Sequence, residues 1–301
     1  MTNKKVVLGI DTGHGNQKSA NTCFPTAIAE VSTQPALTDN ILEVDGKYYS
    51  LTSERMGLRT DKTEDDNFYL LTLVSIAKEL KFRGLRSADI YLAIGVAPAR
   101  FGAEKDQIKK YMMRKSDISF KFEGQLYHIH IEKISVFPQA YSAIVSDIAN
   151  YKRKQYVVDL GSLTLDIIPI VNYTYSEADC ITLNQGVISC ISAVNKECVR
   201  QFGYEIDELD IREIMITGES TLPQKVVIVI KKVITDYVNK ILKVLLENGI
   251  NVERDRITFV GGGATIIKRY ANINSPNITY KLDICANAKG YELLMKKSIE
   301  R

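Results

Sequence analysis

Three short segments in which an apolar run ends at a glycine turn constrain this chain more than any other feature. They are GIDTGHGNQK at residues 9–18, VVDLGSLTLD at residues 157–166 and FVGGGAT at residues 259–265. Each apolar run predicts a buried strand, and the first two segments place an aspartate just before the turn. Because glycine lets backbone amides approach an anion closely, the three turns together predict a nucleotide held between two domains, with Mg²⁺ near its phosphates.

The first turn offers backbone amides and one cation to phosphate oxygens. Its amides can point at the phosphates, and Lys18 can bring a point charge to the same group. A plain hairpin is the alternative for this turn taken alone. The candidate nucleotide contacts here are Asp11, Thr12, Gly13, Gly15, Asn16 and Lys18.

The second turn repeats this arrangement, whereas the third turn is predicted to contact a different part of the nucleotide. Asp159, Gly161 and Ser162 are the candidate contacts of the second turn. Since Mg²⁺ prefers oxygen ligands and keeps several waters, Asp11 and Asp159 are predicted to hold it through water. The third turn, Gly261, Gly262 and Gly263, is predicted to lie against the base or ribose and to open a helix.

Gln139 is the candidate catalytic residue besides Asp159. It is predicted to open a helix over residues 139–150, inside a hinge placed at residues 139–156. A glutamine amide both donates and accepts hydrogen bonds, so it can orient a water for in-line attack on a γ-phosphate. A helix-start residue without a catalytic role is the alternative.

Composition excludes several other classes of protein. The net charge of +3 is too small for direct binding of nucleic acid through phosphates. Five cysteines without a Cys-x-x-Cys motif indicate free thiols in a reducing cytoplasm. No apolar run approaches the roughly 18 residues of a membrane span, and the N-terminal apolar run is too short for a signal peptide. His128 and His130 alternate with apolar residues, which favours a solvated strand face over a metal pair.

Strands and helices alternate in two rounds, and a similar strand–turn signal opens each round. This pattern predicts an α/β fold that arose by internal duplication, with two domains around a cleft. The first domain is predicted to comprise residues 1–155 and 284–301, and the second residues 156–283. Within them we expect strands at residues 21–31, a hairpin at residues 41–51 turning at Asp45-Gly46, and a long helix from Pro223 to a stop at Gly249.

These motifs resemble those of the actin, heat-shock-chaperone and hexokinase superfamily, whose domains are ribonuclease H-like. All five of its segments can be placed, and the resemblance covers essentially the whole chain. They are the phosphate turns at residues 9–18 and 157–166, the adenosine turn at residues 259–265 and the hinge segments at residues 137–142 and 286–294. Within the superfamily, the chain most resembles bacterial actin-like proteins of the ParM (plasmid segregation) group, in the segment DNFYLLTL at residues 66–73 and in IGVAP at residues 94–98.

The resemblance implies a role for each motif residue. Asp11 and Asp159 are similar to the Mg²⁺-linked carboxylates, Lys18 to the phosphate-binding lysine and Gln139 to the residue that positions water. Two departures stand out. Ser162 replaces a glycine usual in the second turn, and Gln139 follows proline where ParM-like chains often carry glutamate.

The function that the resemblance implies is a cytoplasmic ATPase that forms dynamic filaments. Such proteins polymerise head to tail with bound ATP and segregate plasmid DNA through a DNA-bound adaptor protein. GTP remains open, because no motif marks the base contacts near Arg212 and Glu213. A small-molecule kinase of the same superfamily is the alternative. It would need a substrate pocket with a catalytic aspartate, for which no substrate loop is evident.

Overall fold

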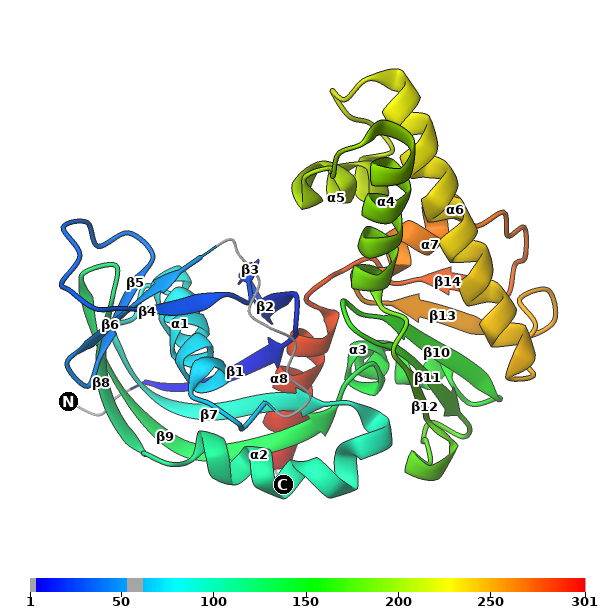
Figure 1. The fold of residues 1–301 in the computed structure, drawn as a ribbon. Coiled ribbons are helices and arrows are strands. Elements are labelled where there is room, and N and C mark those ends of the chain that lie inside the picture. The colour runs from blue at the N-terminus through cyan, green and yellow to red at the C-terminus, as the bar shows by residue number, and fades with distance from the viewer. Residues whose placement is uncertain (1–3, 53–61, 301) are drawn as a thin grey trace. The chain divides into compact units, whose positions relative to one another are not determined.

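The computed structural model describes residues 4–52 and 62–300, which form two compact units (Figure 1). Unit 1 comprises the described residues up to Asp147 and those from Cys285 onward, and unit 2 is Ile148–Ile284. The first break lies inside the hinge predicted at residues 139–156. None of the helices formed by the described residues is long and apolar enough to cross a membrane.

Unit 1 is built on a nine-stranded sheet in the order β3-β2-β1-β7-β9-β8-β5-β6-β4. β1, β7 and β9 are parallel and central, and antiparallel hairpins extend the sheet on both sides. The strands are β1 (Lys5–Thr12), β2 (Asn16–Ser19), β3 (Cys23–Pro25), β4 (Ile28–Val31), β5 (Ile41–Val44), β6 (Lys47–Leu51), β7 (Ser87–Val96), β8 (Asp117–Phe122) and β9 (Gln125–Pro138). The predicted hairpin at Asp45-Gly46 is confirmed, and both residues have the positive φ that such a two-residue turn requires.

Helices cover both faces of this sheet because its central strands are apolar on both sides. Val6 and Leu8 join one core with α1 (Asn67–Phe82) and α2 (Phe101–Met112). Val7, on the other face, packs against Tyr291 and Met295 of α8 (Ala286–Ile299). Two short helices, η1 (Pro98–Arg100) and α3 (Tyr141–Ile144), also belong to unit 1, and η2 (Val145–Asn150) contains the point at which the chain passes into unit 2.

One expectation is corrected in unit 1. Residues 139–150 do not form one helix that Gln139 opens, because β9 continues to Pro138 and Ala140 then takes a left-handed φ of 58°. This turn is fixed from α8, whose Asn287 side chain accepts a hydrogen bond from the Ala140 amide at 2.8 Å. The strands expected at residues 21–31 are confirmed as the short strands β3 and β4, and the intervening Thr26 amide donates a hydrogen bond to the Gly15 carbonyl.

Glycines let α8 lie directly on the sheet. A methyl group on Gly9 of β1 would overlap the backbone carbonyl of Ala288, and one on Gly95 of β7 would overlap the Tyr291 ring. Any side chain at these two positions would therefore push α8 away from the strand that leads into the first turn.

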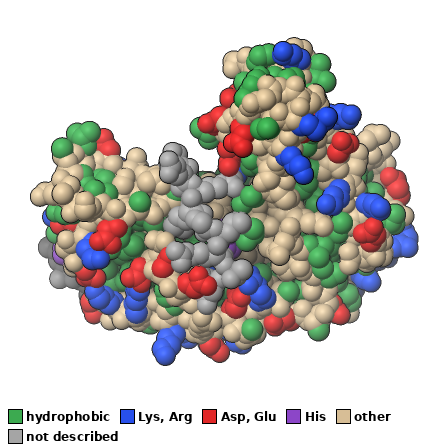
Figure 2. Space-filling model, in the orientation of Figure 1, with side chains coloured by type: hydrophobic (Ala, Val, Ile, Leu, Met, Phe, Trp, Pro, Cys, Tyr) green, Lys and Arg blue, Asp and Glu red, His purple; other side chains and the backbone are tan. Residues whose placement is uncertain are grey.

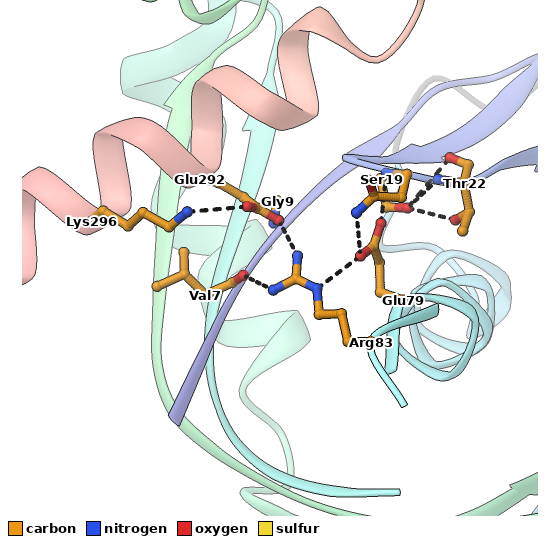
Figure 3. A network of polar contacts seen from close by, with 9 residues as sticks. Val7, Gly9, Ser19, Thr22, Glu79, Arg83, Glu292 and Lys296 are labelled. Atoms are coloured by element: carbon orange, nitrogen blue, oxygen red, sulfur yellow. Dashed lines mark hydrogen bonds and ion pairs between the residues drawn. The ribbon is translucent and has the colours of Figure 1, made fainter. Parts of the chain in front are cut away.

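A polar network centred on Arg83 also connects α8 with β1 and α1 (Figure 3). Arg83 donates hydrogen bonds to Glu79, to the Val7 carbonyl and to Glu292, at 3.1, 3.1 and 2.8 Å. Glu292 also accepts a hydrogen bond from the Gly9 amide at 3.3 Å. The network therefore fixes β1 from two helices, two residues before Asp11.

Glu79 is the fully buried member of this network. Burial alone would raise its pKa, but hydrogen bonds from Ser19 and Asn21 and the charge of Arg83 outweigh burial and hold the pKa below its usual value. The carboxylate is thus kept ionised inside the unit, where it holds the loop after β2 through two hydrogen bonds from Asn21.

Unit 2 has a five-stranded sheet in the order β12-β11-β10-β13-β14. Its elements are β10 (Gln155–Leu160), β11 (Leu165–Ile170), η3 (Glu177–Asp179), β12 (Ile181–Leu183), α4 (Val187–Phe202), α5 (Glu208–Thr217), α6 (Gln224–Glu247), β13 (Ile257–Val260), α7 (Ala264–Tyr270) and β14 (Ile278–Tyr280). The four helices form one core with one face of β10, β11 and β13.

The helix boundaries of unit 2 follow from local sequence. Gly203 ends α4 in the left-handed conformation, and the Asp207 side chain caps α5 by accepting a hydrogen bond from the Leu209 amide. Pro223 precedes the first residue of α6, and Gly249 follows its end, so the predicted bounds of this helix are confirmed.

Candidate functional site

The first glycine turn is the tip of the β1–β2 hairpin, and three predicted residues meet there. Asp11 lies opposite Lys18 in the strand register and is 3% exposed. Its Oδ2 is 3.4 Å from the Lys18 ammonium, and its Oδ1 accepts a hydrogen bond from Gln139 Nε2 at 3.0 Å. The fold therefore brings a carboxylate, a cation and an amide together from two distant parts of the chain.

The turn between Asp11 and Asn16 has a fixed shape. The Gly13 amide donates to the Asp11 carbonyl at 3.0 Å, and a side chain on Gly13 would press on the Asn16 carbonyl. Thr26, which no sequence signal singled out, donates its hydroxyl to the Gly13 carbonyl at 2.6 Å. Because the Thr26 hydroxyl fixes the Gly13 carbonyl, the backbone of the turn is preorganised.

Lys62 is a second cation at this turn, and sequence reasoning missed it because no glycine or strand signal surrounds it. Its ammonium donates hydrogen bonds to the Thr12 carbonyl and, at 3.4 Å, to the Thr12 hydroxyl. Burial lowers the pKa of Lys62 to about 8, with Asp11 opposing that shift. Lys62 is therefore still mostly protonated at neutral pH.

The second glycine turn is the tip of the β10–β11 hairpin and lies against the start of α4. Gly161 donates its amide to the Thr164 carbonyl at 2.9 Å, and the Val187 and Ile188 amides donate to the Gly161 and Ser162 carbonyls. Ser162 does not have a positive φ. The serine in place of the usual glycine therefore causes no backbone strain in this turn.

The third glycine turn lies beside the second because β10 and β13 are parallel neighbours and both turns follow their carboxyl ends. Gly261 has a φ of 78°, and a side chain there would overlap the Asp159 carboxylate. The Gly263 amide donates to the Leu160 carbonyl at 3.0 Å, whereas nothing lies within 4 Å of a side chain built on Gly262. Within unit 2, the predicted phosphate turn and the predicted adenosine turn thus form one continuous backbone surface.

The two hairpins differ in what stands opposite the aspartate. Lys18 faces Asp11 in unit 1, but Asp166 faces Asp159 in unit 2. The Asp166 carboxylate accepts hydrogen bonds from the hydroxyls of Thr164 and Thr182 at 2.8 and 2.5 Å. Unit 2 therefore gathers negative charge at its turn, which suits a cation more than a bare phosphate.

Other residues considered from the sequence do not join these turns. His128 and His130 on β9 form hydrogen bonds with Ser119 and Asp117 on the neighbouring strand β8, as a solvated strand face predicts. Arg212 is paired with Glu208 on α5 at 2.7 Å. Among the described residues, no group of three or more His, Cys, Asp or Glu side chains could enclose a metal ion.

The residues of the turns fit a metal ion bound through its water ligands better than one coordinated directly by carboxylates. Both carboxylate oxygens of Asp11 already accept a hydrogen bond, one from Lys18 and one from Gln139. A direct metal bond would compete with these contacts, whereas a metal-bound water can donate to a remaining lone pair.

Comparison with known proteins assigns the fold. Residues 9–141 match the family model described as the N-terminal domain of actin-like proteins, and residues 157–271 match that of the C-terminal domain of the archaeal MreB-like actin homologue. None of the curated protein sequences matches the chain.

Three solved structures illustrate the likeness. Ta0583, an archaeal actin homologue, has a TM-score of 0.75 at 21% identity and covers 97% of this chain and 99% of its own. It has also been solved in complex with ADP. The Alp12 filament structure has a TM-score of 0.70 at 17% identity, and the match covers 98% of this chain and 99% of Alp12. The structure of Bacillus thuringiensis ParM with ATP has a TM-score of 0.71 at 14% identity, and the match covers 98% of this chain and 99% of that ParM chain. The chain therefore has the mixed α/β, two-domain actin-like fold.

Proposed function

We propose that this chain, whose fold is that of the actin-like proteins, is an ATPase that polymerises into filaments when ATP is bound. The observation that carries the proposal is the meeting of Asp11, Lys18 and Gln139 at a preorganised glycine turn. A carboxylate, a cation and an amide are the groups that phosphoryl transfer to water requires. The solved structures with ADP and with ATP have the same fold and support nucleotide as the ligand.

Each residue takes a role that its contacts allow. The amides of the Gly13 and Gly161 turns and the Lys18 ammonium bind phosphate oxygens, and the Gly261–Gly263 backbone lies against the nucleoside. Asp11 and Asp159 hold the waters of Mg²⁺, which neutralises charge on the phosphates. Gln139 orients the attacking water through its amide oxygen, which has no hydrogen-bond partner among the described residues.

Assembly is proposed to be head to tail, because repeating one heterologous contact makes an open filament. The Alp12 filament structure shares the fold at full length and supports this. The work of the filament is proposed to be segregation of plasmid DNA in the cytoplasm through a DNA-bound adaptor. Blue and red side chains are interspersed over the face drawn in Figure 2, which suits an adaptor better than direct contact of this face with DNA.

Light scattering of the purified chain after addition of Mg-ATP tests the proposal, with phosphate release measured in the same sample. A rise in scattering that decays as phosphate appears is expected for a dynamic filament. GTP and ADP are added in parallel samples, since ADP should bind without sustaining the rise.

The opposite outcome is equally informative. If Mg-ATP binds but scattering stays flat at every workable concentration, the polymerising role is wrong, and a screen for a phosphoryl acceptor would follow for the kinase alternative. Asp179→Asn, at the exposed end of η3 in unit 2, is the control for nonspecific effects of removing one charge.

A further inference from the structure

The Lys62 side chain stands out among the described cations because it is partly buried at the first turn without a carboxylate of its own. Its ammonium contacts the uncharged Thr12 carbonyl and lies 5.5 Å from the centre of the Phe68 ring. Among the described residues no carboxylate lies within 4 Å of it.

Within the described part of the chain, the charges around Lys62 are already paired with one another. Asp11 and Glu104 are the acidic groups whose fields reach it, and Lys18 and Arg100 are the basic ones. Asp11 pairs with Lys18 at 3.4 Å, and Glu104 pairs with Arg100 at 2.8 Å. Of the three positive charges named, that of Lys62 is therefore the one that the described residues neutralise least.

A desolvated cation without a counter-charge is costly, and an anion that binds beside it recovers part of that cost. The partner of Lys62 is the backbone of Thr12, the residue that leads into the Gly13 turn. A polyphosphate bound at that turn would lie close to this ammonium, since the ammonium contacts the backbone that enters the turn. By contrast, Lys18, the phosphate-binding lysine predicted from the sequence, forms an ion pair with Asp11.

We propose that Lys62 is a second phosphate-binding lysine of the first turn and favours nucleoside triphosphate over diphosphate. This inference rests on the proposed nucleotide binding, since it assigns a further residue to the same turn. The triphosphate carries one more negative charge, so the attraction to a poorly neutralised cation is larger for ATP than for ADP.

Calorimetric titration of Mg-ATP and Mg-ADP into the full chain tests this with three substitutions. Lys62→Met removes charge and hydrogen bonds, Lys62→Gln removes the charge but can still donate to the Thr12 carbonyl, and Lys62→Arg keeps the charge. We expect Met and Gln to weaken ATP binding about 10-fold to 100-fold, ADP binding to fall less, and Arg to retain most of the affinity. Lys109→Met, on the exposed face of α2, should bind both nucleotides like the wild type.

The outcomes separate the inference from the proposed function. Wild-type affinity for ATP in Lys62→Gln, or equal losses for ATP and ADP, would overturn the role of Lys62 while the nucleotide-binding function stands. A merely structural Lys62 would give equal losses, because a distorted turn binds both nucleotides worse. A wild-type chain that binds neither nucleotide would overturn both.

Discussion

Gln139 donates a hydrogen bond to Asp11 across 3.0 Å, although 128 positions separate the two residues in the chain. Gln139 directly follows β9 and Asp11 lies near the end of β1, and β7 lies between these two strands in the sheet. Asn287 of α8 accepts a hydrogen bond from the amide of the next residue, Ala140, whose φ is 58°. The position of the glutamine amide is therefore set by three elements, which is what a water-orienting group requires.

Replacing Gln139 by alanine should slow ATP hydrolysis while nucleotide binding is spared. Loss of a positioned group that activates water costs about 100-fold or more in rate, whereas Lys18 still contacts Asp11. Phosphate release and sedimentation of polymer measure this, and filaments should persist longer than those of the wild type. Gln201→Ala, at an exposed position of α4, is the matched control, and hydrolysis at the wild-type rate in Gln139→Ala would remove the role.

Gly261→Ala should abolish nucleotide binding, whereas Gly262→Ala should fold normally. The first change places a methyl group on the Asp159 carboxylate at a φ of 78°, and the second meets no atom within 4 Å. Thermal unfolding and nucleotide titration compare the neighbouring variants. If both behave alike, the close packing of Gly261 on Asp159 has no bearing on the ligand.

Asp159→Ala should abolish turnover of Mg-ATP. Removing this carboxylate takes away one of the two groups assigned to the hydrated metal, and the remaining Asp11 is already engaged by Lys18 and Gln139. Phosphate release at increasing Mg²⁺ concentrations measures the effect. Full activity at ordinary Mg²⁺ would contradict the metal assignment, and Asp236→Ala on the exposed face of α6 provides the control.

Arg83→Met should destabilise the chain by about 3 kcal/mol, because it leaves the fully buried Glu79 carboxylate without its cation. Urea unfolding at neutral pH measures the loss. Lys81→Met, two residues earlier in the last turn of α1, removes an exposed ion pair to Glu123 and should change stability by less than about 1 kcal/mol.

Glu79 should also make stability depend on acid. Its pKa is below the unfolded value of about 4.3, so its contribution is fully present above that pH and is lost as the pH falls through the folded pKa. As the pH is lowered from 6 to 3, the free energy of unfolding should fall less steeply in Glu79→Gln than in the wild type. Parallel curves would mean that Glu79 does not titrate differently on folding.

Local sequence predicted the elements whose signals are short-ranged. The Asp45-Gly46 turn and the helix from Pro223 to Gly249 follow from φ preferences that act within a few residues. The helix expected over residues 139–150 was wrong because β7 pairs with β9 as far as Pro138 and α8 then fixes Ala140. Neither partner is visible in the local sequence.

The sequence by itself determined the three glycine turns, since an apolar strand that ends at glycine specifies each one locally, with an aspartate before the glycine in the first two. It also predicted two α/β domains, because alternation of strands and helices is a property of order along the chain, and the resemblance of its motifs implied the actin-like fold. Only the tertiary structure decided which side chains surround the first turn. Lys62 and Thr26 reach it from segments without a motif, and their contacts depend on strand order and packing rather than on neighbours in sequence.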